Sequence, residues 1–224
     1  RQMCIRDREN SSPRWRGSDF ASQNKEEYME TLKGLPVANA INEKIIEEMK
    51  DWKGAIPHLA IVRVGERPDD MSYERGATKK MEKVGFRCTS YTFPADIDND
   101  TFQKEFDKIN EDEDIDGILL LRPLPKHLDE KAIENRIASV KDLDGISPMN
   151  LAKVYAGDPT GYGPCTAEAV IEMLDYAGVD LKGKRAVVIG RSLVIGKPVA
   201  MMLMKKNATV TVCHTKTVDM PGVC

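Results

Sequence analysis

The sequence lacks the features that mark several broad classes of protein. Its 224 residues contain no apolar run close to the roughly 20 residues that a helix needs to cross a bilayer. Positive charge is not in excess either, because 33 Lys and Arg stand against 36 Asp and Glu and leave a net charge of −3. A chain of this charge carries no electrostatic footprint for nucleic acid. We therefore expect neither a membrane nor a nucleic acid as partner.

Histidine and cysteine are also scarce. The three histidines stand far apart, at positions 58, 127 and 214, and the five cysteines include no C-x-x-C pair. Spacing therefore assembles no metal site, and we expect none. Widely spaced cysteines in odd number are typical of reduced thiols in the cytoplasm, which is the location we expect. Cys165 is interpreted as a small packing residue, because no histidine is placed by sequence to activate it.

Carboxylates, in contrast, are plentiful, and a run of them from residue 111 to residue 116 invites a metal-binding interpretation. Adjacent carboxylates on one turn cannot all converge on an ion, whereas a solvated turn before a buried strand needs no convergence. We favour the solvated turn.

Helix and strand patterns alternate along the first half of the chain. Apolar residues at helical spacing predict three helices, over 37–49, from a cap at Asp69 or Asp70 to Gly85, and over 102–109. Continuous apolar stretches predict three strands, at 59–64, 88–93 and 117–121. This order is typical of a parallel sheet that helices cover on both faces. A further helix is expected from a cap at Thr166 to Gly178.

The segment from residue 184 to residue 217 has the pattern of a nucleotide-binding unit: a strand, a glycine turn, a helix with Pro198 in its first turn, and a second strand. Gly190 and Gly196 bracket the turn. Positions without side chains let backbone N–H groups and the start of the helix approach a pyrophosphate. The alternative is a flavodoxin-like or other α/β turn that binds no nucleotide.

The residues around this turn favour NADP over NAD. An NAD site usually has three glycines and an acidic residue about 20 positions later that binds the ribose hydroxyls. Here Arg191 follows the first glycine, and the second strand runs into Thr215 and Lys216 with no acid at its tip. A guanidinium, an ammonium and hydroxyls suit a ribose phosphate dianion. Ser192 lies within the turn, where its alternative role is a helix cap without a ligand.

Five segments of the chain resemble, in order and spacing, the methylenetetrahydrofolate dehydrogenase/cyclohydrolase family of one-carbon metabolism. They are DGILLLRPLP (116–125), KDLDGISPMNL (141–151), PCT (164–166), VVIGRSLVIGKP (187–198) and ATVTVCHTKT (208–217). The resemblance runs from about Leu32 to Cys224. It implies an α/β fold, in which an N-terminal parallel-sheet domain that binds a tetrahydrofolate derivative is followed by a Rossmann-like NAD(P)-binding domain. It also implies an NADP-dependent dehydrogenase whose methenyl product is hydrolysed in the same site, and a homodimer.

On this basis we expect a disordered or non-native leader over 1–28, with a natural start at Met29, a folate-binding catalytic domain over 29–147 and an NADP-binding domain over 148–224. A doubly wound dinucleotide domain is normally built from two mononucleotide halves. The last segment is too short for both halves, so we expect this second domain to be incomplete.

The resemblance also implies roles for single residues. Tyr73 matches the tyrosine that lies against the aminobenzoate ring of the folate, and Asp144 matches the aspartate that holds the pterin. Arg191 and Thr215 match positions that contact the ribose phosphate of the cofactor, whereas Gly190, Ser192 and Gly196 match the turn. Without the family, Tyr73 is equally a half-buried helix residue, and Asp144 a turn carboxylate before Gly145.

Two positions depart from the family pattern. A lysine four residues after the tyrosine is Ala77 here, and a glutamine before the Leu-Pro-Leu-Pro end of a strand is Leu121. In the family this pair assists proton transfer and water attack in the hydrolytic step. Hydride transfer needs positioning rather than a protein acid or base, whereas proton transfer contributes a factor of about 10² to 10⁴. We therefore expect the dehydrogenase to survive and the cyclohydrolase to be weak or absent.

Three alternatives remain open. Lys80 lies about 20° around a helix from Tyr73 and is placed to lean toward the vacated lysine position, whereas Lys79 points away from it. The second alternative is a binding protein that has lost catalysis but keeps folate or dinucleotide binding. It is also consistent with an inactive fragment.

Overall fold

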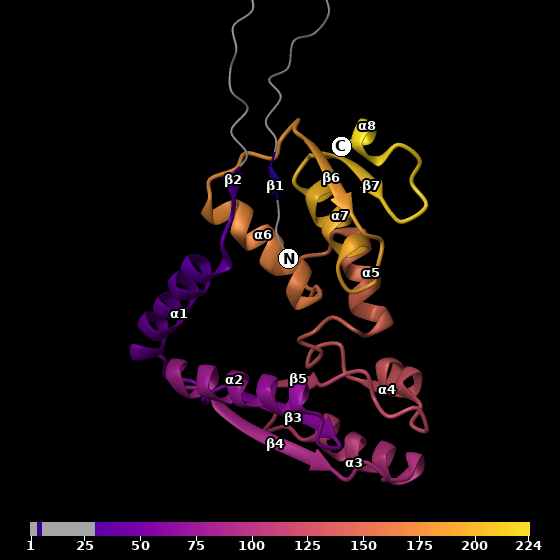
Figure 1. The fold of residues 1–224 in the computed structure, drawn as a ribbon. Helices are drawn as coiled ribbons and strands as arrows, with labels where there is room; N and C mark the ends of the chain where they lie inside the picture. Colours follow the sequence, from indigo (N-terminus) through magenta and orange to yellow (C-terminus); the bar gives the residue numbers. More distant parts are fainter. Residues whose placement is uncertain (1–3, 6–29) are drawn as a thin grey trace, which may run out of the picture.

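The computed structural model of the protein describes residues 4–5 and 30–224 (Figure 1). Strand β1 (Cys4–Ile5) pairs antiparallel with β2 (Glu30–Thr31). The rest of the expected leader, and the expected start at Met29, lie outside the described residues, so these two expectations stay predictions. Within the described part of the chain, no helix combines the length and the apolar character that crossing a bilayer requires.

The first half of the chain forms a parallel three-stranded sheet. Its strands are β3 (His58–Val64), β4 (Arg87–Phe93) and β5 (Gly117–Leu120), in the order β4-β3-β5. Both neighbouring pairs are parallel, as the alternation of strand and helix patterns predicted. The connections run through α2 (Pro68–Val84) and α3 (Asn99–Glu111).

Helices cover this sheet on both faces, α3 on one and α2 on the other. Side chains alternate along a strand, so Ala60, Val62 and Val64 share one face, where they pack with Phe102 and Phe106 of α3. The next residues along β3 point to the opposite face, and there Arg63 pairs with Glu74 of α2. The predicted helix face of residues 102–109 is thus the face that closes the core.

The acidic run from residue 111 to residue 116 links α3 to β5. Asp114 pairs with Arg87 at 2.8 Å and with His58 at 3.0 Å, and Asp116 accepts a hydrogen bond from the His58 N–H at 2.8 Å. These carboxylates therefore fasten the amino-terminal edge of the sheet rather than converge on one point.

Two expected helix caps are wrong. Helix α2 begins at Pro68, and the carbonyl of Arg67 accepts its first hydrogen bond, so Asp69 and Asp70 lie inside the first turn. A proline at this position is already in the helical conformation. Helix α6 (Cys165–Tyr176) begins similarly after Pro164, which leaves Thr166 in the first turn. The expected end of α2 is confirmed, because Gly85 adopts a left-handed conformation with a φ of 82°.

The second half of the chain forms a β-α-β unit with additional helices. Strands β6 (Arg185–Ile189) and β7 (Thr209–Cys213) are parallel neighbours, and α7 (Gly196–Lys205) connects them. Apolar residues of α6 and α7 share one core cluster, which includes Ala167, Ile171, Leu174, Val199 and Leu203. A short helix, α8 (Met220–Val223), follows β7.

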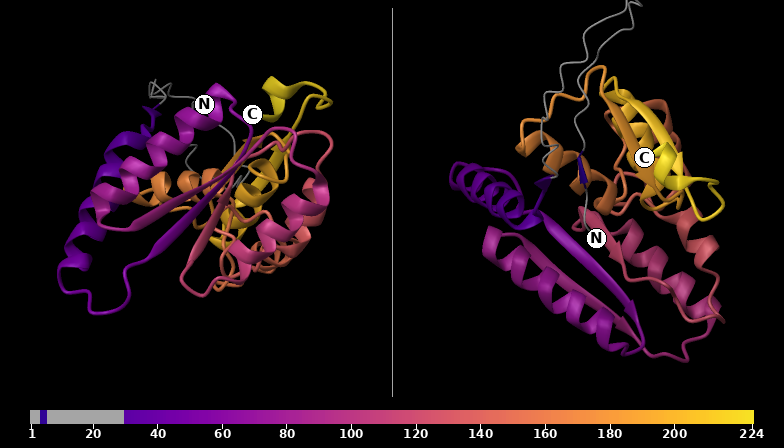
Figure 2. Two further views of the ribbon diagram at one scale, coloured as in Figure 1. Left: turned by 90° about the horizontal axis from the view of Figure 1, so that it is seen from below. Right: turned by 45° about the horizontal axis from the view of Figure 1, so that its top comes forward.

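Three elements join the two halves. Helix α1 (Gly34–Lys50), which contains the predicted helix over 37–49, contacts both α2 and α6, and Figures 1 and 2 show it beside α2. On the other side, the chain passes through α4 (Glu130–Arg136) and α5 (Pro148–Ala156), which the sequence patterns did not predict. The candidate site lies where α2, the loop before α5 and the start of α6 meet.

Candidate functional site

A buried aspartate shapes the loop between α4 and α5. Asp142 is 0% exposed, and its carboxylate accepts hydrogen bonds from the N–H groups of Ile146 at 3.0 Å and Ser147 at 2.8 Å. The side-chain amide of Asn150, also 0% exposed, donates a third bond at 3.0 Å. The loop is thereby braced from inside, and Asp144 projects from it.

The same loop packs tightly against the segment that leads into α6. Gly145 has a φ of 59°, and a Cβ on it would lie 2.7 Å from backbone atoms of Tyr162, Gly163 and Pro164. A larger residue would therefore have to push the two segments apart. This close approach brings Asp144 next to Cys165, the first residue of α6.

Tyr73, Asp144 and Cys165 form one group. The pKa of Tyr73 is raised, first by burial and then by the charges of Cys165 and Asp144. Burial, followed by the charge and hydrogen bonding of Asp144, raises the pKa of the Cys165 thiol to about 11, and this thiol donates to the Leu143 carbonyl at 3.2 Å. Both groups are thus protonated at neutral pH. Tyr73 lies on α2, and its side chain is 59% exposed.

A mainly apolar cavity of about 410 Å³ adjoins this group. Residues of α1 and α6 line it together with the loop, among them Val37, Ile41, Leu143, Cys165 and Met173. Cys165 belongs both to the wall of this cavity and to the group, whereas Tyr73 and Asp144 are not among the lining residues.

The two positions that depart from the family pattern hold side chains without polar atoms. Ala77 is half-buried on α2, and Leu121 is 7% exposed, with its N–H bound to the Val62 carbonyl at 2.9 Å. Neither side chain can donate or accept a proton. Lys80 is exposed, one turn beyond Ala77.

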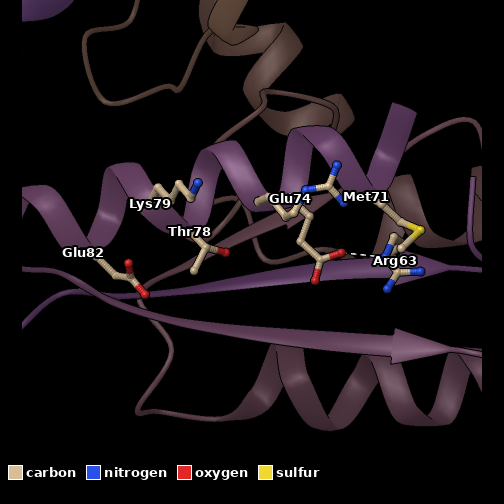
Figure 3. A pocket seen from close by; sticks show the side chains of 7 residues that line it. Arg63, Met71, Glu74, Thr78, Lys79 and Glu82 are labelled. Atoms are coloured by element: carbon tan, nitrogen blue, oxygen red, sulfur yellow. Dashed lines mark hydrogen bonds and ion pairs between the residues drawn. The ribbon is translucent and has the colours of Figure 1, made fainter. Parts of the chain in front are cut away.

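A second cavity of about 410 Å³ lies on another flank of α2 (Figure 3). Its lining is charged and includes Arg63, Glu74, Lys79 and Glu82. Arg63 donates to Glu74 at 2.6 Å; burial opposes ionisation of Glu74, but bonds from Ser90 and Arg63 outweigh it and lower the pKa of this carboxyl. The lining residues of α2 lie about 100° or more around the helix from Tyr73, so this cavity is separate from the Tyr73 group.

The glycine turn is compact. A Cβ on Gly196 would lie 2.2 Å from the carbonyl oxygen of Gly190, and Gly190 itself has a φ of 136°, which disfavours any side chain there. Ser192 Oγ accepts hydrogen bonds from the N–H groups of Ile195 at 3.1 Å and Gly196 at 3.4 Å. Ser192 thus ties the turn to the start of α7, whose N-cap position is Ile195, and its role toward a ligand stays a prediction. Pro198 is buried in the first turn of α7, as predicted.

The ends of β6 and β7 meet at the carboxyl edge of their sheet. The N–H of Gly190 donates to the Cys213 carbonyl at 2.8 Å, so Arg191 and Thr215 follow adjacent strand ends. Both of these residues are exposed. The segment after β7 folds into a turn in which the N–H of His214 donates to Thr217 Oγ1 at 2.8 Å. The edge thus combines a helix start, exposed hydroxyl and guanidinium groups, and no carboxylate between residues 214 and 217.

These features fit the phosphates of a dinucleotide, because a guanidinium and hydroxyl groups lie beside a helix start, where the helix dipole favours an anion. The N–H groups of Ile195, Gly196 and Lys197 are themselves bonded to Ser192. The parallel β-α-β unit with this turn, following a separate parallel sheet, defines a two-domain α/β protein of the dinucleotide-binding class.

Comparison with known proteins gives the family. Residues 32–144 match the family described as tetrahydrofolate dehydrogenase/cyclohydrolase, catalytic domain, and residues 164–224 match the NAD(P)-binding domain of the same family. The chain belongs to the tetrahydrofolate dehydrogenase/cyclohydrolase family.

Individual proteins and solved structures similar to this chain belong to the same family. The bifunctional protein FolD of Clostridium kluyveri is 48% identical over 195 residues, which are 86% of this chain and 69% of that protein. FolD of Carboxydothermus hydrogenoformans is 49% identical over 87% of this chain and 69% of its own length. The structure of the bifunctional enzyme FolD from Campylobacter jejuni superposes with a TM-score of 0.79 at 34% identity, covering 83% of this chain and 67% of that one. That of the Trypanosoma brucei enzyme, complexed with NADP cofactor and inhibitor, gives a TM-score of 0.76 at 36% identity, covering 83% and 64%.

The family resemblance and the expected fold, a parallel-sheet catalytic domain followed by an NAD(P)-binding domain, are thus confirmed. The expected domain boundaries at residues 28 and 147, and the roles of the single site residues, stay predictions.

Proposed function

We propose that the protein is an NADP-dependent methylenetetrahydrofolate dehydrogenase whose second family activity, hydrolysis of methenyltetrahydrofolate, is weak or absent. One observation carries this proposal. The group formed by Tyr73, Asp144 and Cys165 is intact, whereas the two positions where the family has proton-handling residues hold Ala77 and Leu121.

The folate side rests on Tyr73 and Asp144. The exposed Tyr73 side chain is available to lie against an aromatic ring, and Asp144 is available to accept hydrogen bonds from the donors of a reduced pterin. The apolar cavity that Cys165 lines suits the rest of a flat, partly aromatic substrate. The two residues hold and orient the carbon that is oxidised, which is the positioning work that hydride transfer demands.

The cofactor side rests on the glycine turn. Gly190, Ser192 and Gly196 form a compact turn at the start of α7, where the helix dipole suits a pyrophosphate, and Arg191 and Thr215 supply donors for a ribose phosphate. When bound, NADP supplies the acceptor for the hydride. The Trypanosoma brucei relative is described as complexed with NADP, which supports this assignment.

Hydrolysis lacks a proton carrier in this group. A general acid or base works best with a pKa near the operating pH, but the raised pKa values of Tyr73 and Cys165 keep both protonated. The pair that supplies this function in the family is replaced by apolar side chains, at a cost of about 10² to 10⁴ in rate. Lys80 remains the alternative carrier, and the Lys80→Met variant tests it: unchanged hydrolysis excludes the lysine.

The second candidate is a binding protein that has lost both reactions, and the apolar side chains of Ala77 and Leu121 favour it. Reduction of NADP by methylenetetrahydrofolate separates the two functions. We expect reduction that is abolished or strongly slowed by Tyr73→Ala and unaffected by Tyr155→Ala, which removes another exposed tyrosine. Binding of both molecules without NADP reduction would favour the second candidate. The homodimer and the cytoplasmic location stay predictions.

A further inference from the structure

Arg122 lies directly beyond the end of β5 and is a third departure from the family pattern. The resemblance places a leucine after the glutamine at this strand end, and here Arg122 follows Leu121. The side chain of Arg122 is only 19% exposed. A guanidinium is rarely buried to this extent unless carboxylates pair with it, so its partners identify its role.

Those partners come from two different elements. One terminal nitrogen, Nη1, lies 3.1 Å from Glu134 Oε1 and 3.8 Å from Glu130 Oε1, both on α4. The other, Nη2, lies 3.7 Å from Asp144 Oδ2. Glu130 also accepts a hydrogen bond from the N–H of Leu124 at 2.7 Å, which fixes the strand end against α4. Arg122 is thus anchored on α4 and directs its second nitrogen toward Asp144.

The distance to Asp144 matters for binding. At 3.7 Å the two groups attract each other electrostatically, but the separation exceeds that of a hydrogen bond. The carboxylate of Asp144, whose side chain is 33% exposed, therefore keeps its capacity to accept bonds from a ligand. The neighbouring Tyr73 and Cys165 are protonated and uncharged at neutral pH, so Arg122 provides the positive charge in this group.

The presence of Arg122, together with the absence of a lysine at position 77, also explains which of the two family reactions is kept. A lysine can give up its proton, whereas a guanidinium stays protonated at every pH that the protein tolerates. A cation at position 122 rather than at position 77 therefore supports the carboxylate of Asp144 but offers no proton for the attack of water.

We propose that Arg122 is a positioning residue that holds the Asp144 carboxylate oriented toward the pterin. It acts through Asp144 and does not itself touch the substrate. This inference rests on the proposed function.

The test compares the full chain with Arg122→Gln, which keeps a hydrogen-bonding group near Glu134 but removes the charge, and with Arg122→Lys, which keeps the charge. The control is Arg136→Gln, because Arg136, at the end of α4, pairs with Asp107 of α3 at 2.8 Å.

We measure the affinity for tetrahydrofolate and for NADP by calorimetry, and the KM and kcat of NADP reduction. We expect about tenfold weaker tetrahydrofolate binding in Arg122→Gln, equivalent to about 1.4 kcal/mol. We also expect a raised KM for methylenetetrahydrofolate, an unchanged affinity for NADP, partial recovery in Arg122→Lys and no change in Arg136→Gln.

A double-mutant cycle with Asp144→Asn separates positioning from a general structural role. If Arg122 acts through Asp144, Arg122→Gln weakens tetrahydrofolate binding in the parent but adds little in the Asp144→Asn background. Equal losses in both backgrounds, or an Arg122→Gln variant that binds like the parent, overturn the inference alone. A parent chain that binds no tetrahydrofolate overturns the proposed function as well. Should Arg122→Gln not fold, the same cycle with Arg122→Lys decides, since a lysine reaches fewer of the three carboxylates.

Discussion

Replacing Asp142 by alanine removes the acceptor that organises the loop carrying Asp144. Three buried donors are then affected. The N–H groups of Ile146 and Ser147 lose their acceptor, and the side-chain amide of Asn150, which also donates to the Ser139 carbonyl at 2.9 Å, loses one bond. A hydrogen bond to a charged group contributes about 1.5–3 kcal/mol. Because three neighbouring losses are not additive and water enters the gap, we expect the free energy of unfolding to fall by about 3–5 kcal/mol. That is a large share of the roughly 5–15 kcal/mol that stabilises a typical protein.

Urea unfolding followed by circular dichroism measures this loss. With a denaturant dependence of about 2 kcal/mol/M, the midpoint shifts down by about 2 M. Asp142→Asn keeps one acceptor oxygen and should cost less, about 1–3 kcal/mol. The control is Asp107→Ala, which breaks the exposed pair with Arg136 and should cost at most about 1 kcal/mol. An Asp142→Ala variant that unfolds at the same urea concentration as the parent would refute the bracing role of Asp142.

Three further outcomes are expected. Gly196→Ala should weaken NADP binding at least about tenfold, because the new Cβ meets the Gly190 carbonyl oxygen at 2.2 Å. The control Gly76→Ala, where a Cβ meets nothing within 4 Å, should leave NADP binding intact. Equal affinities for NADP in the two variants would contradict the turn geometry. Alkylation of the Cys165 thiol should be slow at neutral pH and should become faster only as the pH approaches its pKa of about 11. Peptide mapping assigns the rate to Cys165, with glutathione as the reference thiol. A rate that stops rising at the same pH as that of glutathione would count against the raised pKa. Arg191→Ala should reduce the preference for NADP over NAD about 10- to 100-fold by weakening NADP alone, and equal losses for both cofactors would argue against a ribose-phosphate contact.

Much of the fold was predictable because local patterns and burial agree. The apolar runs that became β3 and β5 are largely buried, and the spacing of Phe102 and Phe106 marks the face of α3 that covers them. The glycine turn was predictable for a different reason. At Gly196 the backbone passes so close to Gly190 that only glycine fits, and such a requirement is visible in the residue type itself.

The missed elements are short helices whose starts are not marked by apolar spacing. Helices α4 and α5 are short, and their starts are set by side chains such as Ser147, which accepts a hydrogen bond from the N–H of Asn150 at 3.2 Å. The two mistaken caps have a local cause: the helices begin immediately at or after a proline, one or two residues before the expected cap residues Asp69, Asp70 and Thr166.

The candidate site was predictable only in part, because the roles of its residues depend on contacts between segments that lie far apart in the sequence. Asp142 and Asp144 stand two residues apart with no local difference that assigns their roles, yet one is fully buried and the other faces Arg122. The signal for Arg122 was present in the sequence as a charge at the end of a buried strand. Its meaning depends on α4 and on the loop before α5, which supply its three carboxylate partners.

The rate of methenyltetrahydrofolate hydrolysis relative to the rate of NADP reduction, measured on the same preparation, tests the proposed division of activities most directly. The ratio is independent of how much of the preparation is active. We expect NADP reduction with hydrolysis no faster than the spontaneous rate, and a gain in the ratio of up to about 10²-fold when Ala77→Lys and Leu121→Gln are combined. Enzyme-catalysed hydrolysis in the parent at a rate comparable to NADP reduction would contradict the proposal.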